Sequence, residues 1–97
     1  MGRTAMCGVI TSHSPRRFQQ VSRSLRIAGQ STTVRLEHAF WAVLDEIAED
    51  EGTTTARLVS TLHEEALEFH DEMLNFASVL RTVCLLYQEG RLAAGRA

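Results

Sequence analysis

Four residues between positions 24 and 35 have side chains suited to binding a nucleic acid. They are two hydroxyl residues and two arginines, spaced two apart in each pair: Ser24, Arg26, Thr33 and Arg35. An arginine can donate two hydrogen bonds at once to guanine O6 and N7, or to a phosphate. A threonine offers a hydroxyl to a base edge and a methyl group to thymine. This chemistry is recognition of a ligand and not catalysis.

Two predicted strands carry these side chains. In each strand the apolar residues share one parity: Val21, Leu25 and Ile27 in the first, Val34 and Leu36 in the second. Alternation of this kind gives a strand one buried face and one polar face, and Arg23 is the only charge on the apolar side. Residues 28–31 offer a turn in which Gly29 can take a positive φ. We therefore predict a β-hairpin over residues 21–36, with the four binding residues on its polar face.

Helical spacing begins directly after the second strand. Phe40, Leu44 and Ile47 repeat every three to four residues, and carboxylates fill the opposite side. Gly52 is expected to end this helix, and the hydroxyls of residues 53–55 are expected to cap a second one. That second helix carries Leu58, Val59 and Leu62.

The chain beyond residue 59 allows two interpretations. Apolar residues continue at helical spacing to Tyr87 without glycine or proline, so periodicity alone permits one long helix. Asn75 is a good N-cap, and an apolar stripe follows it, so we favour a break between His70 and Asn75 and a separate third helix. We interpret residues 1–20 as a flexible arm, residues 21–89 as the domain and residues 90–97 as a polar tail.

Charge and composition restrict the classes of function. Before His38 six arginines face one acid, and after it four arginines face eleven acids. The first third of the chain could therefore meet phosphate, while the slightly acidic whole argues against indiscriminate binding to nucleic acid. Two cysteines are too few for a disulfide framework, and no apolar run is long enough to span a bilayer. These features predict a cytoplasmic protein with no membrane partner.

The order of strand, helix, glycine turn and capped helix over residues 31–62 resembles the ribbon-helix-helix family of DNA-binding proteins. Four stretches are similar to an uncharacterised bacterial branch of that family: Arg23–Gly29, Ser31–Glu37, Phe40–Trp41 and Asn75–Ser78. That branch adds a strand before the ribbon and a helix after the core motif. The resemblance implies a mainly α fold with a short β-hairpin, dimeric through an intersubunit antiparallel sheet.

The resemblance also implies a function, that of a sequence-specific transcriptional regulator, expected to be a repressor, which binds double-stranded DNA as a homodimer. Its paired strands would enter the major groove, where Thr33 and Arg35 would contact bases. Four strands are wider than the groove, so only the central pair could enter, and the resemblance suggests that the strand nearer the first helix is central. DNA backbone contacts are expected from Ser24, Arg26, Thr54, Thr55 and Arg57. Residues expected in the core or dimer interface are Val34, Leu36, Phe40, Trp41, Leu44, Ile47, Leu58, Val59 and Leu62.

Two other functions stay open. The first is a protein-interaction module of the same fold, such as an antitoxin-like protein, whose partner would dock on the C-terminal helices. The second is a metal- or effector-switched repressor, because His63 and His70 lie two turns apart near Glu64 and Asp71. Their spacing lacks the tighter repeats of strong metal motifs, so we predict no metal site. No cysteine has a base beside it and no glycine loop could hold a phosphate, so no catalytic residue and no cofactor are expected.

Overall fold

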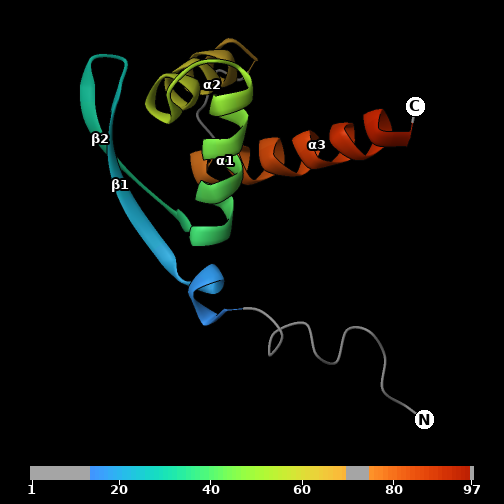
Figure 1. The fold of residues 1–97 in the computed structure, drawn as a ribbon. Coiled ribbons are helices and arrows are strands. Elements are labelled where there is room, and N and C mark those ends of the chain that lie inside the picture. Colours follow the sequence, from blue (N-terminus) through green and yellow to red (C-terminus); the bar gives the residue numbers. More distant parts are fainter. Residues whose placement is uncertain (1–13, 70–74, 97) are drawn as a thin grey trace.

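A hairpin and three helices make up most of the structure. The computed structural model describes residues 14–69 and 75–96. A short 3-10 helix, η1 (Pro15–Phe18), leads into strands β1 (Gln20–Ile27) and β2 (Gln30–Glu37), and these are followed by helices α1 (His38–Asp50), α2 (Thr55–Phe69) and α3 (Phe76–Arg96). The hairpin lies on one side of α1 and α3 on the other, with α2 near the hairpin turn (Figure 1).

The hairpin has a two-residue turn and an unbroken antiparallel register. Gln20 pairs with Glu37 at the open end and Ile27 with Gln30 at the turn. The turn residues Ala28 and Gly29 have φ values of 52° and 80°. Two successive positive φ values are what a type I′ turn requires, and this turn matches the twist of the strands. The predicted hairpin and the positive φ of Gly29 are confirmed, whereas the positive φ of Ala28 was not foreseen.

Helix α1 begins without an intervening loop and ends at a glycine. The side chain of Glu37 makes no capping hydrogen bond to the helix. At the other end the N–H of Gly52 donates to Glu49 O at 3.1 Å, and the N–H of Thr53 donates to Ala48 O at 2.9 Å. These two bonds and the φ of +69° at Gly52 form a Schellman motif, which confirms the predicted stop.

Helices α2 and α3 are separate, and each has a side-chain cap. The Oγ1 of Thr54 accepts from the N–H of Arg57 at 3.2 Å. The Oδ1 of Asn75 accepts from the N–H groups of Ala77 at 3.1 Å and Ser78 at 3.4 Å. The break predicted before Asn75 is therefore confirmed, and one long helix is excluded.

The two ends of the chain differ in part from the sequence-based expectation. Most of the predicted arm lies outside the described residues, but its last part forms η1, capped by Ser14 Oγ on the N–H of Arg16 at 3.2 Å. At the other end α3 runs to Arg96, so residues 90–96, predicted as a polar tail, continue the helix. The reason is compositional, because the leucine, alanines and arginines after Gly90 are good helix formers, and each of the two glycines, Gly90 and Gly95, costs only about 1 kcal/mol.

The core lies between the hairpin and the three helices. Its largest fully buried side chains come from β2, α1, α2 and α3: Leu36, Trp41, Leu44, Val59, Leu80 and Cys84. Of the remaining residues predicted for the core or a dimer interface, Val34 and Ile47 are buried, and Phe40, Leu58 and Leu62 are half-buried against the core. No helix among residues 14–69 and 75–96 combines the length and the apolar character that a membrane crossing requires.

Candidate nucleic-acid interface

The polar face of the hairpin points away from the helices and forms one continuous surface, termed here the outer face. It consists of three cross-strand pairs: Ser22 with Arg35, Ser24 with Thr33, and Arg26 with Ser31. All six of these side chains are exposed and none is acidic. The next pair of the same parity, Gln20 with Glu37 at the open end, adds one carboxylate, which accepts hydrogen bonds from Gln20 and Arg81. The predicted base contacts, Thr33 and Arg35, therefore lie beside Ser24 and Arg26, which were predicted to contact the DNA backbone.

The two arginines of the outer face are engaged differently. Arg26 Nη1 donates to the carbonyl oxygen of Gly29 at 3.0 Å, which ties its side chain to the turn. Arg35 is exposed and takes part in neither ion pair found in the described part of the chain, Arg23–Asp45 and Arg81–Glu37. Its guanidinium can thus move to a base edge without breaking an ion pair.

The first turn of α2 supplies free backbone donors. The first N–H groups of a helix precede its own hydrogen bonds and favour an anion. The Oγ1 of Thr54 accepts from the N–H of Arg57, and the carbonyl oxygen of Thr54 accepts from the N–H of Leu58 at 2.9 Å. The hydroxyl of Thr55 donates to Asp45 Oδ1 at 2.7 Å, so its proton is committed within the fold. A phosphate contact at Thr55 would therefore use the backbone N–H and not the side chain.

A groove of ≈ 400 Å³ separates the hairpin turn from α2. Arg26 and the turn residues line it from one side, and Ala56, Arg57, Ser60 and Glu64 line it from the other. Two of the predicted backbone contacts, Arg26 and Arg57, come from different elements and face this same groove. Two arginines beside a helix N-terminus give this groove an attraction for phosphate, which Glu64 partly offsets.

A second group of polar residues ties the back of the hairpin to α1 and α2. Arg23 donates from Nη1 and Nη2 to the two carboxylate oxygens of Asp45, at 2.8 Å and 3.1 Å. Its guanidinium also lies 4.5 Å from the ring centroid of Trp41. The hydrogen bonds from Arg23 and Thr55 hold the pKa of Asp45 below its usual value. The sequence signalled this cluster only through Arg23, the one charge of its strand on the apolar side.

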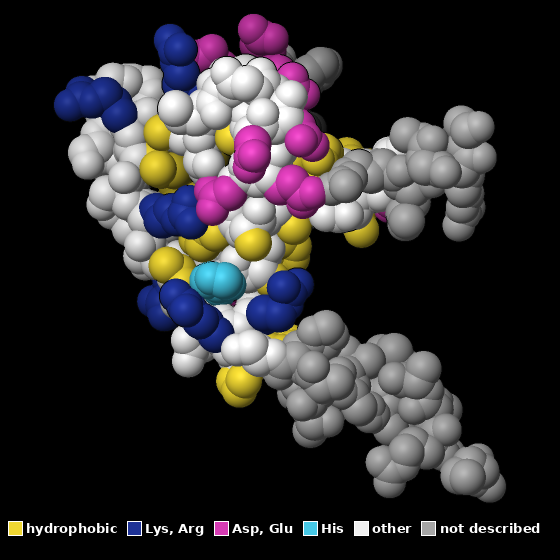
Figure 2. Space-filling model, viewed as in Figure 1, with side chains coloured by type: hydrophobic (Ala, Val, Ile, Leu, Met, Phe, Trp, Pro, Cys, Tyr) yellow, Lys and Arg dark blue, Asp and Glu magenta, His cyan; other side chains and the backbone are white. Residues whose placement is uncertain are grey.

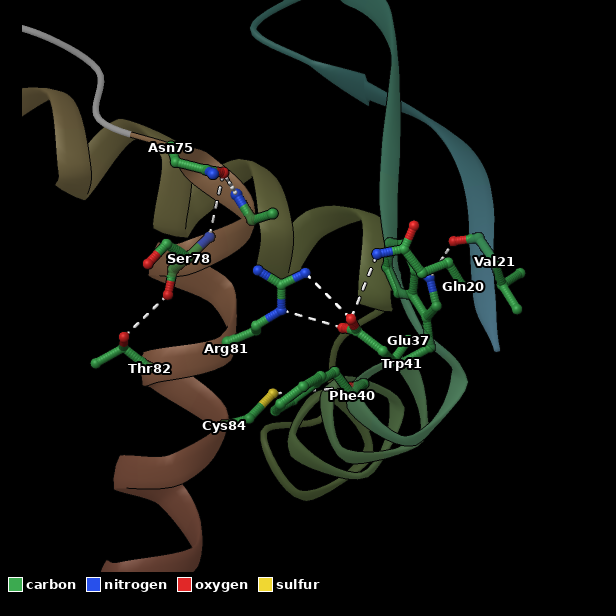
Figure 3. A network of polar contacts seen from close by, with 11 residues as sticks. Gln20, Val21, Glu37, Phe40, Trp41, Asn75, Ser78, Arg81, Thr82 and Cys84 are labelled. Atoms are coloured by element: carbon green, nitrogen blue, oxygen red, sulfur yellow. Dashed lines mark hydrogen bonds and ion pairs between the residues drawn. The ribbon is translucent and has the colours of Figure 1, made fainter. Parts of the chain in front are cut away.

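A third group fixes α3 to the junction of β2 and α1 (Figure 3). Arg81 donates from Nε and Nη2 to Glu37 at 3.0 Å and 3.3 Å, and its guanidinium lies 5.9 Å from the Phe40 ring centroid. The bond from Arg81 holds the pKa of Glu37 below its usual value. Beneath this pair, burial raises the pKa of the Cys84 thiol to about 11, so Cys84 stays protonated and acts as a small core residue.

The family to which this arrangement belongs is identified by comparison. Residues 20–88, from the first residue of the hairpin well into α3, match the ribbon-helix-helix domain. The chain belongs to this family. Ribbon-helix-helix domains generally bind DNA and form dimers, and the family commonly comprises DNA-binding regulators or antitoxins without enzymatic activity.

One solved structure similar to this ribbon-helix-helix chain covers nearly all of it. It is an uncharacterised protein from Bordetella pertussis Tohama I, with 40% sequence identity and a TM-score of 0.84. The match covers 98% of this chain and 75% of that chain. No significant match is found among functionally curated proteins. The similarity therefore establishes the fold, including the elements outside the core ribbon-helix-helix motif.

Charge is distributed unevenly over the ribbon-helix-helix domain. Arginines lie along the hairpin side, and carboxylates gather over α1 and α2 (Figure 2). The exposed carboxylates of these two helices are Glu49, Asp50, Glu64, Glu65 and Glu68. A polyanion approaching the domain is thus attracted to the hairpin and repelled from the acidic surfaces of α1 and α2.

Potential metal ligands are scattered over the described residues. No group of three or more histidine, cysteine, aspartate or glutamate side chains lies close enough there to hold a metal ion. His63 packs edge-on against Phe76, with the ring centroids 5.2 Å apart, so its surroundings are partly apolar. Its suggested partners His70 and Asp71 lie outside the described residues.

Proposed function

We propose that this chain is a sequence-specific DNA-binding transcriptional regulator, expected to act as a repressor in the cytoplasm. The observation that carries the proposal is the outer face, an exposed and acid-free strand surface with Thr33 and Arg35 on the strand that leads into α1. The family's general association with DNA supports it.

The proposal includes a homodimer joined through β2. The two-residue turn makes Ile27 and Gln30 a hydrogen-bonded pair, and such pairs alternate along an antiparallel ladder. The backbone groups of Thr33 and Arg35 therefore point to the outer edge of β2. The described sheet has two strands, so this edge can accept the β2 of a second copy. A two-fold axis between the strands would present Thr33 and Arg35 twice, to two half-sites.

The width of the resulting sheet divides the DNA contacts between the strands. Four strands spaced about 4.8 Å apart, with side chains added, exceed a major groove about 12 Å wide. Only the β2 pair enters, so Arg35 binds guanine O6 and N7, and Thr33 contacts a base edge or a thymine methyl. Ser24 and Arg26 on β1 then face the phosphates at the groove edges, where Thr54, Arg57 and the N–H of Thr55 add further contacts.

A DNA-binding titration of the wild type, Arg35→Ala and Arg57→Ala separates base recognition by Arg35 from phosphate binding by Arg57. The DNA probes are the promoter region of the chain's own gene and an unrelated duplex, each at two salt concentrations. Arg35→Ala should lose the preference for the promoter, at a cost of roughly 1–3 kcal/mol, because base readout is lost. Arg57→Ala should weaken binding to both duplexes equally. It should also reduce the slope of log affinity against log salt concentration by about one.

The proposal is refuted if the wild type, as a folded dimer, binds neither duplex above background at low salt.

Exposed leucines favour a second candidate function, that of a protein-interaction module. Leu85 and Leu86 on α3 are 58% and 59% exposed, and Leu67 near the end of α2 is 46% exposed. Such side chains suit a protein partner docked on the C-terminal helices. Absence of DNA binding by a folded dimer would make this the leading function.

A further inference from the structure

The cluster of Arg23, Asp45 and Thr55, termed here the clamp, lies directly behind β2. This strand carries Thr33 and Arg35 and is termed here the reading strand. Arg23 pairs across the hairpin with Val34, the residue between Thr33 and Arg35. Its side chain leaves the opposite face of the sheet and reaches α1, where it stacks on the ring of Trp41 and bonds to Asp45. The middle of the reading strand and the clamp are therefore separated only by the thickness of the sheet.

One carboxylate oxygen of the clamp joins the hairpin to α2. Asp45 Oδ1 accepts from Arg23 Nη1 at 2.8 Å and from the hydroxyl of Thr55 at 2.7 Å. Thr55 is the first residue of α2, next to the capping Thr54. Two hydrogen bonds to the same atom thus fix the start of α2 relative to β1.

The clamp is a poor candidate for a purely stabilising feature. The side chains of Arg23 and Asp45 are 36% and 46% exposed, and ion pairs with such exposure contribute little to folding stability. A comparable pair, Arg81 and Glu37, is 33% and 28% exposed and ties α3 to the β2–α1 junction. The two pairs are similar in chemistry, but only the clamp connects the two elements proposed to touch DNA.

We propose that the carboxylate of Asp45 and the hydroxyl of Thr55 are positioning groups for sequence recognition, which act without touching DNA themselves. The clamp sets the distance and angle between the reading strand and the phosphate-binding start of α2. The base contacts of the reading strand and the phosphate contacts of α2 can then form at the same time on one DNA site. The affinity gained from the correct bases therefore adds to the affinity gained from the phosphates. Without the clamp, α2 shifts relative to the strand and one contact forms at the expense of the other. This inference rests on the proposed function.

The test compares two clamp variants with matched variants elsewhere. Thr55→Val removes one hydroxyl without changing charge, and Thr82→Val does the same on α3, where Thr82 Oγ1 donates to Ser78 O at 2.9 Å. Asp45→Ala removes the clamp carboxylate, and its control Glu37→Ala removes the carboxylate of the other ion pair. Each variant is titrated, at a temperature where its thermal melt shows it fully folded, with the duplex most enriched by the wild type from a randomised pool and with a scrambled duplex.

The measured quantity is the ratio of the two affinities. Thr55→Val and Asp45→Ala should each lower this ratio about fivefold or more, with little change for the scrambled duplex in Thr55→Val. The two control variants should keep the wild-type ratio. In the Asp45→Ala background Thr55→Val should have no further effect, because both changes remove the same bond.

The outcomes separate this inference from the function on which it rests. If the wild type binds both duplexes alike, the proposed function fails and the inference fails with it. A different result is that the wild type prefers the enriched duplex, Arg35→Ala has lost this preference, and both clamp variants keep the wild-type ratio of affinities. In that case the proposed function stands and the positioning role is refuted. Equal losses in the clamp variants and their controls would also refute it, because they would reflect general destabilisation.

Discussion

Replacement of Leu80 by alanine tests whether α3 is an integral part of the fold. Leu80 is fully buried and packs in the core, whereas Leu85, further along the same helix, is 58% exposed. Leu80→Ala and Leu85→Ala therefore make the same chemical change on one helix in opposite environments. Any difference in helix propensity between leucine and alanine is common to both variants and cancels.

The expected magnitude follows from burial. Leu80→Ala removes three carbon atoms, which at about 0.8 kcal/mol each accounts for roughly 2.4 kcal/mol. A residual cavity raises the cost, and leucine-to-alanine changes in cores typically cost about 2–5 kcal/mol. The loss cannot exceed the free energy with which α3 docks on the other elements. We expect Leu80→Ala to lower the free energy of unfolding by roughly 2–4 kcal/mol and Leu85→Ala by less than about 0.5 kcal/mol.

Urea unfolding followed by circular dichroism provides the measurement. Both variants and the wild type are compared at one protein concentration, because association with a second copy would add to the apparent stability. The slope of the free energy against urea shows whether both variants unfold the same structure. If Leu80→Ala and Leu85→Ala have equal midpoints, α3 is not packed on the core through Leu80, and the arrangement described here is wrong.

Two further predictions concern the hairpin turn and the ion pairs. Ala28→Gly should raise the free energy of unfolding by roughly 0.5–1 kcal/mol, since it relieves a positive φ. The control Ala66→Gly, in the interior of α2, should lower the free energy of unfolding by about 1 kcal/mol. Thermal melts of both variants measure these changes, and shifts in the same direction would contradict the prediction. Because the pKa of Glu37 is lowered in the folded state, the unfolded chain takes up the proton first. Wild-type stability should therefore fall more steeply than that of Glu37→Gln as the pH drops below about 4.3, and equal slopes in urea titrations would contradict this.

Local patterns in the sequence predicted most of the elements. Alternation located the hairpin, Gly52 located the end of α1, and Asn75 located the start of α3, because each depends on neighbouring residues alone. The outer face followed from parity in the same way. The positive φ of Ala28 was missed because alanine has no preference for it, and the turn type is imposed by the pairing of the strands.

The partners of charged residues were beyond local reasoning. Arg23 and Asp45 are 22 residues apart, and Arg81 and Glu37 are 44 residues apart. With ten basic and twelve acidic residues, spacing alone cannot select these pairs. The sequence showed that Arg23 was unusual on an apolar face, but only the packing of α1 against the hairpin supplied Asp45. Contacts between distant elements are thus harder to foresee than the residues that share one face of a strand.

The burial of α3 residues in the common core has a consequence for the order of folding. Leu80 and Cys84 are buried in the same core as Leu36 and Trp41, and Arg81 bonds to Glu37, which lies 44 residues earlier in the sequence. Contacts so distant in sequence form only after a long loop has closed, and this closure costs conformational entropy. A chain whose last third is still missing would therefore leave this side of the core uncovered until α3 docks.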